Sequence, residues 1–257
     1  METLFATSPD GTRIAFDVQG EGPAVILLHG GGHTRQRWHE TGYVNRLKSS
    51  FTIITIDIRG NGESDKPTNP TAYTTNKICE DILAVADDCG ADRFSILGFS
   101  FGGNIARYLT AQSERVDKVI IVGISFGPGV YGEFAEQIPK FLDRWKPITQ
   151  AQLAGTFDPQ SLNERERTFV SNVYMPAWVA TIEAMVSWGT IEPADLLCSA
   201  LLIVGTENKS AMTHLKSYHG AMEKAGVHLE IFEGLTHNEE FTEIDVVLPT
   251  IMTFLRT

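Results

Sequence analysis

One serine of the chain stands between glycines where a strand pattern changes into a helix pattern. The apolar run Phe94–Leu97 leads into the letters GFSFGG, with Ser100 at their centre, and a pattern of helical period follows. A serine on so sharp a turn has a strained backbone, and side chains two positions to either side of it would collide. The following helix points its amino terminus, which favours negative charge, at the serine. This arrangement predicts that Ser100 is a nucleophile.

A histidine and a run of glycines supply the other parts of such chemistry. His237 follows the last predicted strand, comes after the serine in the chain and precedes the final helix, which is the position of a general base. The letters HGGG at 29–32 end an early strand, and a backbone without side chains can present an N–H to a substrate oxygen. We expect the N–H groups of Gly31 and Phe101 to form an oxyanion hole, and His29 to support the loop.

The elements around these residues alternate between short apolar runs rich in β-branched residues and longer segments of helical period. This alternation is typical of a mostly parallel sheet covered by helices. A turn at Asp10-Gly11 predicts that the first strands are antiparallel. The predicted strands are Thr12–Val18, Ala24–Leu28, Thr52–Ile56, Arg93–Leu97, Lys118–Val122, Leu201–Val204 and His228–Phe232. The predicted helices lie near Trp38–Leu47, Asn76–Cys89, Phe101–Gln112, Ala211–Ala225 and Ile244–Leu255.

Residues 127–192 interrupt this rhythm, because they hold several short helical patterns separated by prolines and no strand-like run. We expect residues 1–126 and 193–257 to form the core domain and 127–192 to form a helical cap over the carboxyl edge of the sheet, where ligands bind in open α/β folds. The cap is rich in aromatic residues, which favours a largely apolar pocket. Trp145 and Trp178 in the cap, and Trp38 in the core, are the predicted substrate contacts.

Composition and charge narrow the classes of function. The chain has 42% hydrophobic and 21% charged residues, as in ordinary globular proteins, and a net charge of −11, which disfavours nucleic acid as a partner. No run approaches the roughly 20 apolar residues of a membrane span, and the start lacks the pattern of a secretory signal. We therefore expect a cytoplasmic protein with a small-molecule substrate and no membrane partner. The oligomeric state stays open.

Metal binding is not expected. The cysteines, Cys79, Cys89 and Cys198, are odd in number and fit no metal spacing, which indicates a reducing compartment. His33 and His39 lack a cysteine or carboxylate at ligand spacing.

Taken together, the motifs resemble the α/β-hydrolase superfamily over nearly the whole chain. The resemblance rests on HGGG at 29–32, DIRGNGES at 57–64, the GFSFGG turn around Ser100 and THNEEF at 236–241. Within the superfamily, the spacing is similar to small cofactor-independent esterases, lactonases, haloperoxidase-like enzymes and carbon–carbon bond hydrolases. A serine rather than an aspartate at position 100 disfavours the epoxide hydrolase and dehalogenase branches.

The resemblance implies an α/β-hydrolase fold and the cleavage of a carboxylic ester or lactone through an acyl-enzyme, without a cofactor. The pocket composition favours a small to medium, largely apolar substrate. Two alternatives stay open. One is carbon–carbon bond hydrolysis or perhydrolysis with the same residues. The other is a catalytically weakened binding or receptor-like protein on the hydrolase scaffold.

The acid of the implied Ser–His–acid group is missing from its usual place. In the family an aspartate follows the strand at Leu201–Val204 in a G-x-x-D run, and this chain has Gly-Thr-Glu-Asn at 205–208. The other family position, just after Val122, offers only Gly-Ile-Ser. An asparagine can accept the imidazole N–H through its carbonyl, but it brings no charge to stabilise the imidazolium.

Four interpretations follow. Asn208 orients His237 as a neutral partner, Glu207 swings in as the acid, another carboxylate comes from elsewhere in the chain, or the chain is a natural or engineered weakened variant. Because Asn208 stands at the position of the triad acid, the sequence predicts that Asn208→Asp raises ester turnover.

Overall fold

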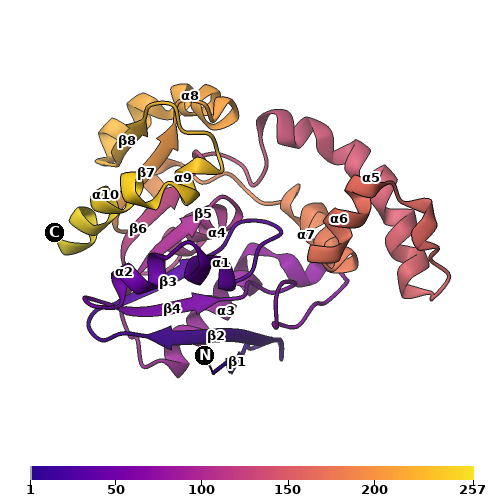
Figure 1. Cartoon of the computed structure of the whole chain (residues 1–257). Coiled ribbons are helices and arrows are strands. Elements are labelled where there is room, and N and C mark those ends of the chain that lie inside the picture. The colour runs from indigo at the N-terminus through magenta and orange to yellow at the C-terminus, as the bar shows by residue number, and fades with distance from the viewer. Residues whose placement is uncertain (1) are drawn as a thin grey trace.

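The strands form one sheet in the computed structural model, which describes residues 2–257. They are β1 Leu4–Thr7, β2 Arg13–Gln19, β3 Ala24–Leu28, β4 Thr52–Ile56, β5 Phe94–Phe99, β6 Val116–Val122, β7 Ser199–Gly205 and β8 His228–Phe232. Their order across the sheet is β1-β2-β4-β3-β5-β6-β7-β8 (Figure 1). Strand β2 pairs antiparallel with β1 and β4, and every other neighbouring pair is parallel. The predicted α/β-hydrolase fold with a mostly parallel sheet is confirmed.

The central strands are continuous apolar runs because both of their faces are buried. In β3, Ile26 and Leu28 join the core on one face of the sheet, whereas Val25 and Leu27 join the core on the other face. A strand buried on both faces needs no polar alternation, which is the usual pattern in parallel sheets covered by helices. The carboxyl ends of these strands carry the loops that hold the predicted site residues.

Helices cover both faces of the sheet. The α-helices are α1 Gln36–Glu40, α2 Tyr43–Leu47, α3 Thr75–Asp88, α4 Phe101–Thr110, α5 Gly132–Leu153, α6 Glu164–Asn172, α7 Met175–Met185, α8 Lys209–Ala225, α9 Glu239–Thr242 and α10 Ile244–Arg256. The 3-10 turns are η1 Pro70–Tyr73, η2 Pro159–Ser161 and η3 Pro193–Asp195. Buried residues of α3, α4 and α8 pack on one face, and those of α1, α2, α9 and α10 pack on the other.

Two helices differ from the sequence-based expectation. The helix predicted near Trp38–Leu47 is divided into α1 and α2 at Gly42, whose φ of 89° lies outside the helical region. Helix α5 runs through Pro139 and Pro147, where breaks were expected. Each proline removes one backbone donor, but α5 buries an apolar side that includes Trp145 against the neighbouring helices, and this burial favours the continuous helix.

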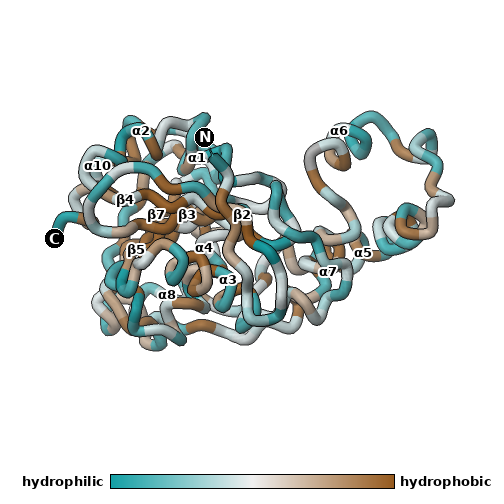
Figure 2. The backbone as a smooth tube through the Cα atoms, turned by 90° about the horizontal axis from the view of Figure 1, so that it is seen from below, coloured by the Kyte–Doolittle hydropathy of each residue, from teal (hydrophilic) through white to brown (hydrophobic). Residues whose placement is uncertain are grey.

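Helices α5, α6 and α7 follow one another between β6 and β7, in the segment 127–192, which we call the insertion. Figures 1 and 2 show α5 and α6 extending to one side of the sheet, with α7 between them and the core. The insertion has a small apolar cluster of its own, formed by Trp145, Ile148, Leu162, Val173, Met175 and Val179. Within residues 2–257, no helix combines the length and the apolar character that crossing a membrane requires.

Candidate active site

Ser100 lies on a sharp turn between β5 and α4. Its φ of 52° and ψ of −112° make it the only non-glycine residue among residues 2–257 with a positive φ. A Cβ atom at Gly98 would overlap the carbonyl oxygen of Gly102, and a Cβ atom at Gly102 would overlap that of Leu28. The glycines on either side are therefore required by the close approach of three backbone segments, and the turn holds Ser100 in a strained conformation.

His237 lies in the loop between β8 and α9, and its ring faces the serine. The Nε2 atom of His237 is 3.0 Å from the Oγ atom of Ser100, a distance suited to a hydrogen bond. The imidazole stacks on the ring of Phe99, with the ring centroids 5.0 Å apart, and Phe241 stacks on Phe99 in turn at 4.7 Å. This aromatic stack supports the histidine in the orientation that a base for Ser100 needs.

Glu240 supplies a carboxylate on the other side of the histidine. It is fully buried in α9, three residues after His237 in the chain, and its Oε2 atom is 3.2 Å from Nδ1 of the imidazole. Its Oε1 atom accepts hydrogen bonds from the backbone N–H of Gly205 at 2.6 Å and from the side-chain amide of Asn208 at 3.0 Å. Glu239 and Glu240 follow His237 within three residues, so the sequence itself placed carboxylates close to the predicted base.

Asn208 presents its amide N–H, and not its carbonyl, to the site. The Oδ1 atom accepts a hydrogen bond from the backbone N–H of Ala211 at 3.2 Å, because Asn208 is the N-cap of α8. The Nδ2 atom then lies 3.0 Å from the carbonyl oxygen of Gly123 and 3.1 Å from Nδ1 of His237. The expected role, in which the carbonyl of Asn208 accepts the imidazole N–H, does not agree with this orientation.

Glu207 points away from the histidine. Its side chain is 46% exposed and forms an ion pair with Lys209 at 2.8 Å. The interpretation in which Glu207 acts as the acid is therefore corrected: Glu240 occupies the space beside His237.

The two predicted oxyanion-hole residues line the same cavity as Ser100 and His237. Phe101 is the first residue of α4, so its N–H has no acceptor within the helix. Gly31 lies in the loop after β3, and the side chain of nearby His29 stabilises this loop. The buried ring of His29 contacts the carbonyl oxygen of Gly30 through Nδ1 at 2.8 Å and accepts the backbone N–H of Ile58 at Nε2. Burial lowers the pKa of His29 to about 4, so the ring is neutral near pH 7.

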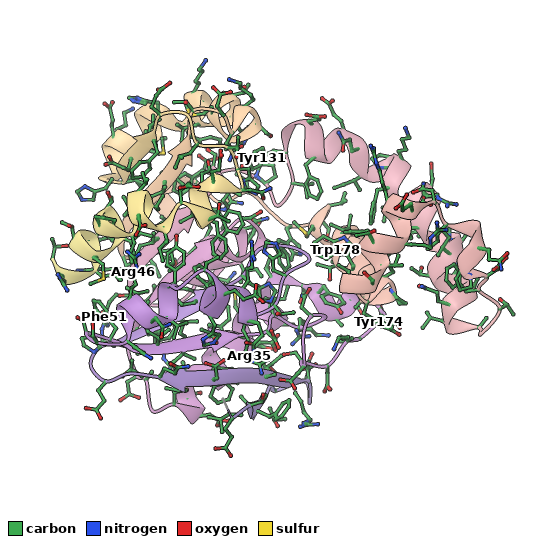
Figure 3. All side chains as sticks on the ribbon, viewed as in Figure 1. Arg35, Arg46, Phe51, Tyr131, Tyr174 and Trp178 are labelled. Atoms are coloured by element: carbon green, nitrogen blue, oxygen red, sulfur yellow. The ribbon has the colours of Figure 1, made fainter. Side chains whose placement is uncertain are left out.

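The cavity over the serine has a volume of about 420 Å³ and lies between the core and the insertion. Its lining residues are mostly apolar or aromatic, and none of those described is Asp, Glu, Lys or Arg. They are Gly31, Ser100, Phe101, Asn104, Gly123, Ile124, Gly129, Val130, Tyr131, Phe134, Trp178, Met185, Asn208, Ser210, Ala211 and His237. Figure 3 shows Tyr131 and Trp178 at the junction between the core and the insertion.

Of the three tryptophans predicted to contact substrate, the structure brings only Trp178 to this cavity. The ring of Trp178 covers Gly31 so closely that a Cβ atom there would lie 2.6 Å from Cη2, and it meets Phe101 edge-on. Trp145 is instead buried in the apolar cluster of the insertion. Trp38 is buried beneath the site, where it packs edge-on against Phe241. We correct both expectations, because these two side chains fill apolar cores.

A second cavity, of about 320 Å³, lies between core loops and the insertion and does not reach Ser100 or His237. It is more polar than the first, and Lys66 and His33 are among its lining residues. The Lys66 ammonium already donates to the carbonyl oxygens of Gly62 and Ser64. In the described part of the chain, no group of three or more His, Cys, Asp or Glu side chains is placed to hold a metal ion.

The protein belongs to the α/β-hydrolase fold family, whose model matches residues 23–175. An uncharacterized protein of Mycobacterium tuberculosis is 36% identical over 124 residues, which are 47% of this chain and 34% of that protein. Epoxide hydrolase 3 of Siraitia grosvenorii is 29% identical over 121 residues, which are 46% of this chain and 38% of that enzyme. The matches therefore span only about a third of the length of these curated relatives.

Solved structures resemble the whole chain. An esterase from Exiguobacterium antarcticum superposes with a TM-score of 0.79 at 22% identity, over 100% of both chains. At this level of identity the likeness shows a shared fold. The family and the fold together define the protein as an α/β hydrolase.

Proposed function

We propose that the protein is a serine hydrolase that cleaves a carboxylic ester or lactone through an acyl-enzyme. The observation that carries the proposal is the 3.0 Å approach of His237 Nε2 to the Oγ of Ser100, on a strained turn that borders a largely apolar cavity. A nucleophile within hydrogen-bond distance of its base is the geometric signature of this chemistry. None of the described lining residues is Asp, Glu, Lys or Arg, so the proposed substrate is neutral, small to medium and largely apolar.

In the proposed mechanism, Oγ of Ser100 attacks the carbonyl carbon while its proton passes to Nε2 of His237. The N–H groups of Gly31 and Phe101 donate to the oxyanion that develops. The carbon–oxygen bond then breaks, the proton on Nε2 passes to the leaving alkoxide, and the acyl group remains on Ser100. A water molecule repeats the cycle: His237 takes its proton, the hydroxide oxygen attacks, and the proton returns to Ser100 as the acid leaves.

The buried carboxylate of Glu240 beside His237 favours catalysis over a binding protein on the same scaffold, because an imidazolium that forms during turnover needs a nearby negative charge. Carbon–carbon bond hydrolysis and perhydrolysis would use the same residues. Substrate trials distinguish these activities from ester cleavage.

The test begins with a fluorophosphonate probe, which reacts with activated serines. We expect one label on the intact protein, no label on Ser100→Ala, and unchanged labelling of Ser210→Ala, in which the substituted serine lines the same cavity. A panel of neutral p-nitrophenyl esters and lactones, paired with substrates of similar size that carry a carboxylate, then tests the substrate class. Labelling that persists in Ser100→Ala would refute the assignment of the nucleophile, and a preference for anionic substrates would refute the assignment of a neutral ligand.

A further inference from the structure

We infer that the acid that completes this site has moved to Glu240, and that Asn208 is a clamp that holds the Glu240 carboxylate against His237. The inference deepens the proposed function and rests on it. Glu240 acts through the imidazole, and Asn208 acts through Glu240, so both are positioning residues. The glutamate comes from helix α9, after the base in the chain, whereas the acid expected from the sequence comes from a strand end before it.

The side chain of Glu240, from α9, fills the space between the ends of β6 and β7. A Cβ atom at Gly123, just after β6, would lie 2.7 Å from Oε2 of Glu240 and 2.9 Å from Nδ1 of His237. The backbone N–H of Gly205, the last residue of β7, donates to Oε1 of the same carboxylate. Both strand ends from which an acid was expected thus border the Glu240 carboxylate. A side chain at position 123 would displace it.

The donors around Glu240 suit an ionised carboxylate. Its oxygens lie within hydrogen-bond distance of the Gly205 N–H, the Asn208 amide and Nδ1 of His237. Hydrogen bonds from N–H groups to a carboxylate are stronger than bonds between neutral groups. An amide at position 208 adds donors without adding a second negative charge, which a carboxylate at that position would bring.

The hydrogen bonds also select the tautomer of His237. The Nδ2 atom of Asn208 has two hydrogens and lies within about 3.1 Å of Gly123 O, both oxygens of Glu240 and His237 Nδ1. If one hydrogen goes to Gly123 and the other to Glu240, Nδ1 of His237 carries its own proton and donates it to Glu240. Nε2 is then unprotonated and able to accept the proton of Ser100.

The opposite tautomer would arise if an amide replaced Glu240. The amide introduced by Glu240→Gln, or that of Asn208, would then donate to Nδ1, and Nε2 would carry the proton. The equivalent exchange of acid for amide in a serine-protease triad lowers kcat by about 10⁴ through the wrong tautomer. We expect Glu240→Gln to lower the rate of serine acylation by roughly 10²- to 10⁴-fold on the same reasoning.

The arrangement reverses the expectation for Asn208→Asp. That change places a second carboxylate about 3 Å from the buried Glu240 carboxylate, and two carboxylates that share a site cannot both ionise easily. We expect Asn208→Asp to lower the acylation rate by about 10-fold or more, where the sequence alone predicts a gain. The double variant Asn208→Asp/Glu240→Gln restores one carboxylate and one amide to the same space. It should exceed Glu240→Gln by at least about 10-fold, because the aspartate introduced at position 208 can accept the Nδ1 proton.

The experiment compares the parent with these three variants, and with Glu207→Gln as a matched control on an exposed glutamate next to Asn208. Two rates are measured against pH: ester hydrolysis, and labelling of Ser100 by a fluorophosphonate. The groups in contact with His237 are Ser100, Glu240 and Asn208, and the ring of His33, in the loop after β3, lies close enough to interact electrostatically. Nitrogen-15 NMR of the imidazole reports which ring nitrogen carries the proton.

The proposal predicts a proton on Nδ1 in the parent, transfer to Nε2 in Glu240→Gln, and partial rescue of rate in the double variant, with Glu207→Gln unchanged. A parent with the proton on Nε2, or a Glu240→Gln enzyme with parental rates, would overturn it. A gain of activity in Asn208→Asp would overturn it as well. If Glu240→Gln does not fold, the parent NMR spectrum and the Asn208→Asp rates decide the outcome.

Failure of the proposed function has a different signature. If Ser100 takes no label and no ester is cleaved, the serine hydrolase assignment fails, while the NMR spectrum still reports whether Nδ1 of His237 donates to Glu240. If Ser100 is labelled at the same rate in the parent and in Glu240→Gln, the hydrolase assignment stands and the role of Glu240 fails.

Discussion

Replacing Ser100 by glycine or by alanine removes the same hydroxyl group, but only alanine keeps a Cβ atom on the strained backbone. Both changes delete the contact with His237, so the difference between the two variants isolates the Cβ atom at φ 52° and ψ −112°. A non-glycine residue in so sparsely populated a region costs about 1–3 kcal/mol. Glycine at an ordinary position lowers stability by about 0.5–1 kcal/mol, because the unfolded chain is more flexible. We therefore expect Ser100→Gly to be more stable than Ser100→Ala by about 1 kcal/mol, or roughly 2–4 °C in Tm for a domain of this size.

Urea denaturation and differential scanning calorimetry measure this difference. The matched control is Ser217, an exposed residue within α8, where glycine should be less stable than alanine by about 1 kcal/mol. The sign of the glycine–alanine difference must therefore be opposite at the two positions. If Ser100→Gly is less stable than Ser100→Ala by the margin found at Ser217, the backbone at the serine is not strained, and the argument from the sharp turn is refuted.

Two further predictions concern the pocket and the loop beneath the oxyanion hole. Trp178→Leu should change the ranking of acyl chains in an ester panel and favour bulkier acyl groups. Trp145→Leu should lower stability and leave the ranking unchanged. Equal changes of ranking in the two variants would contradict the assigned pocket. Burial holds the pKa of His29 at about 4 against an ordinary 6.5, so the unfolded chain binds more protons than the folded one between these values. The contribution of His29 to stability is complete above pH 6.5 and is lost as the pH falls towards 4, by roughly 3 kcal/mol. In His29→Asn, the free energy of unfolding measured with urea should decrease less between pH 6.5 and 4 than in the parent. An equal decrease in both proteins would show that other groups cause the pH dependence.

The central strands of the sheet could be predicted from the sequence because they are short, buried, apolar runs. The predicted ranges Ala24–Leu28, Thr52–Ile56 and His228–Phe232 are those of β3, β4 and β8. Strand β1, Leu4–Thr7, was not assigned a range, because it is a short edge strand with mostly exposed side chains. The course of α5 was also missed, since local rules end a helix at proline, and only packing against other helices favours its continuation.

Within the candidate site, the residues predicted from local patterns lie together, whereas only Trp178 of the three tryptophans predicted from residue type lies with them. Ser100, Phe101 and Gly31 belong to turns whose glycines are required by the backbone, so the letters themselves indicate the geometry. Trp38 and Trp145 were predicted from their aromatic character alone. A large apolar side chain fills a core as readily as it lines a pocket, and the difference depends on tertiary packing that no local pattern contains.

The residues at positions 123, 208 and 240 together determine where the carboxylate beside His237 lies. An asparagine at position 208 and a glycine at position 123 each suggest, taken singly, that the site has lost its negative charge. Glu240 restores it from the opposite side, and its carboxylate would collide with a side chain at 123 and be repelled by an aspartate at 208. The three residues therefore form one arrangement in which the space beside His237 accommodates a single carboxylate. It follows that an acid introduced at position 208 should restore activity only when the charge of Glu240 is removed at the same time.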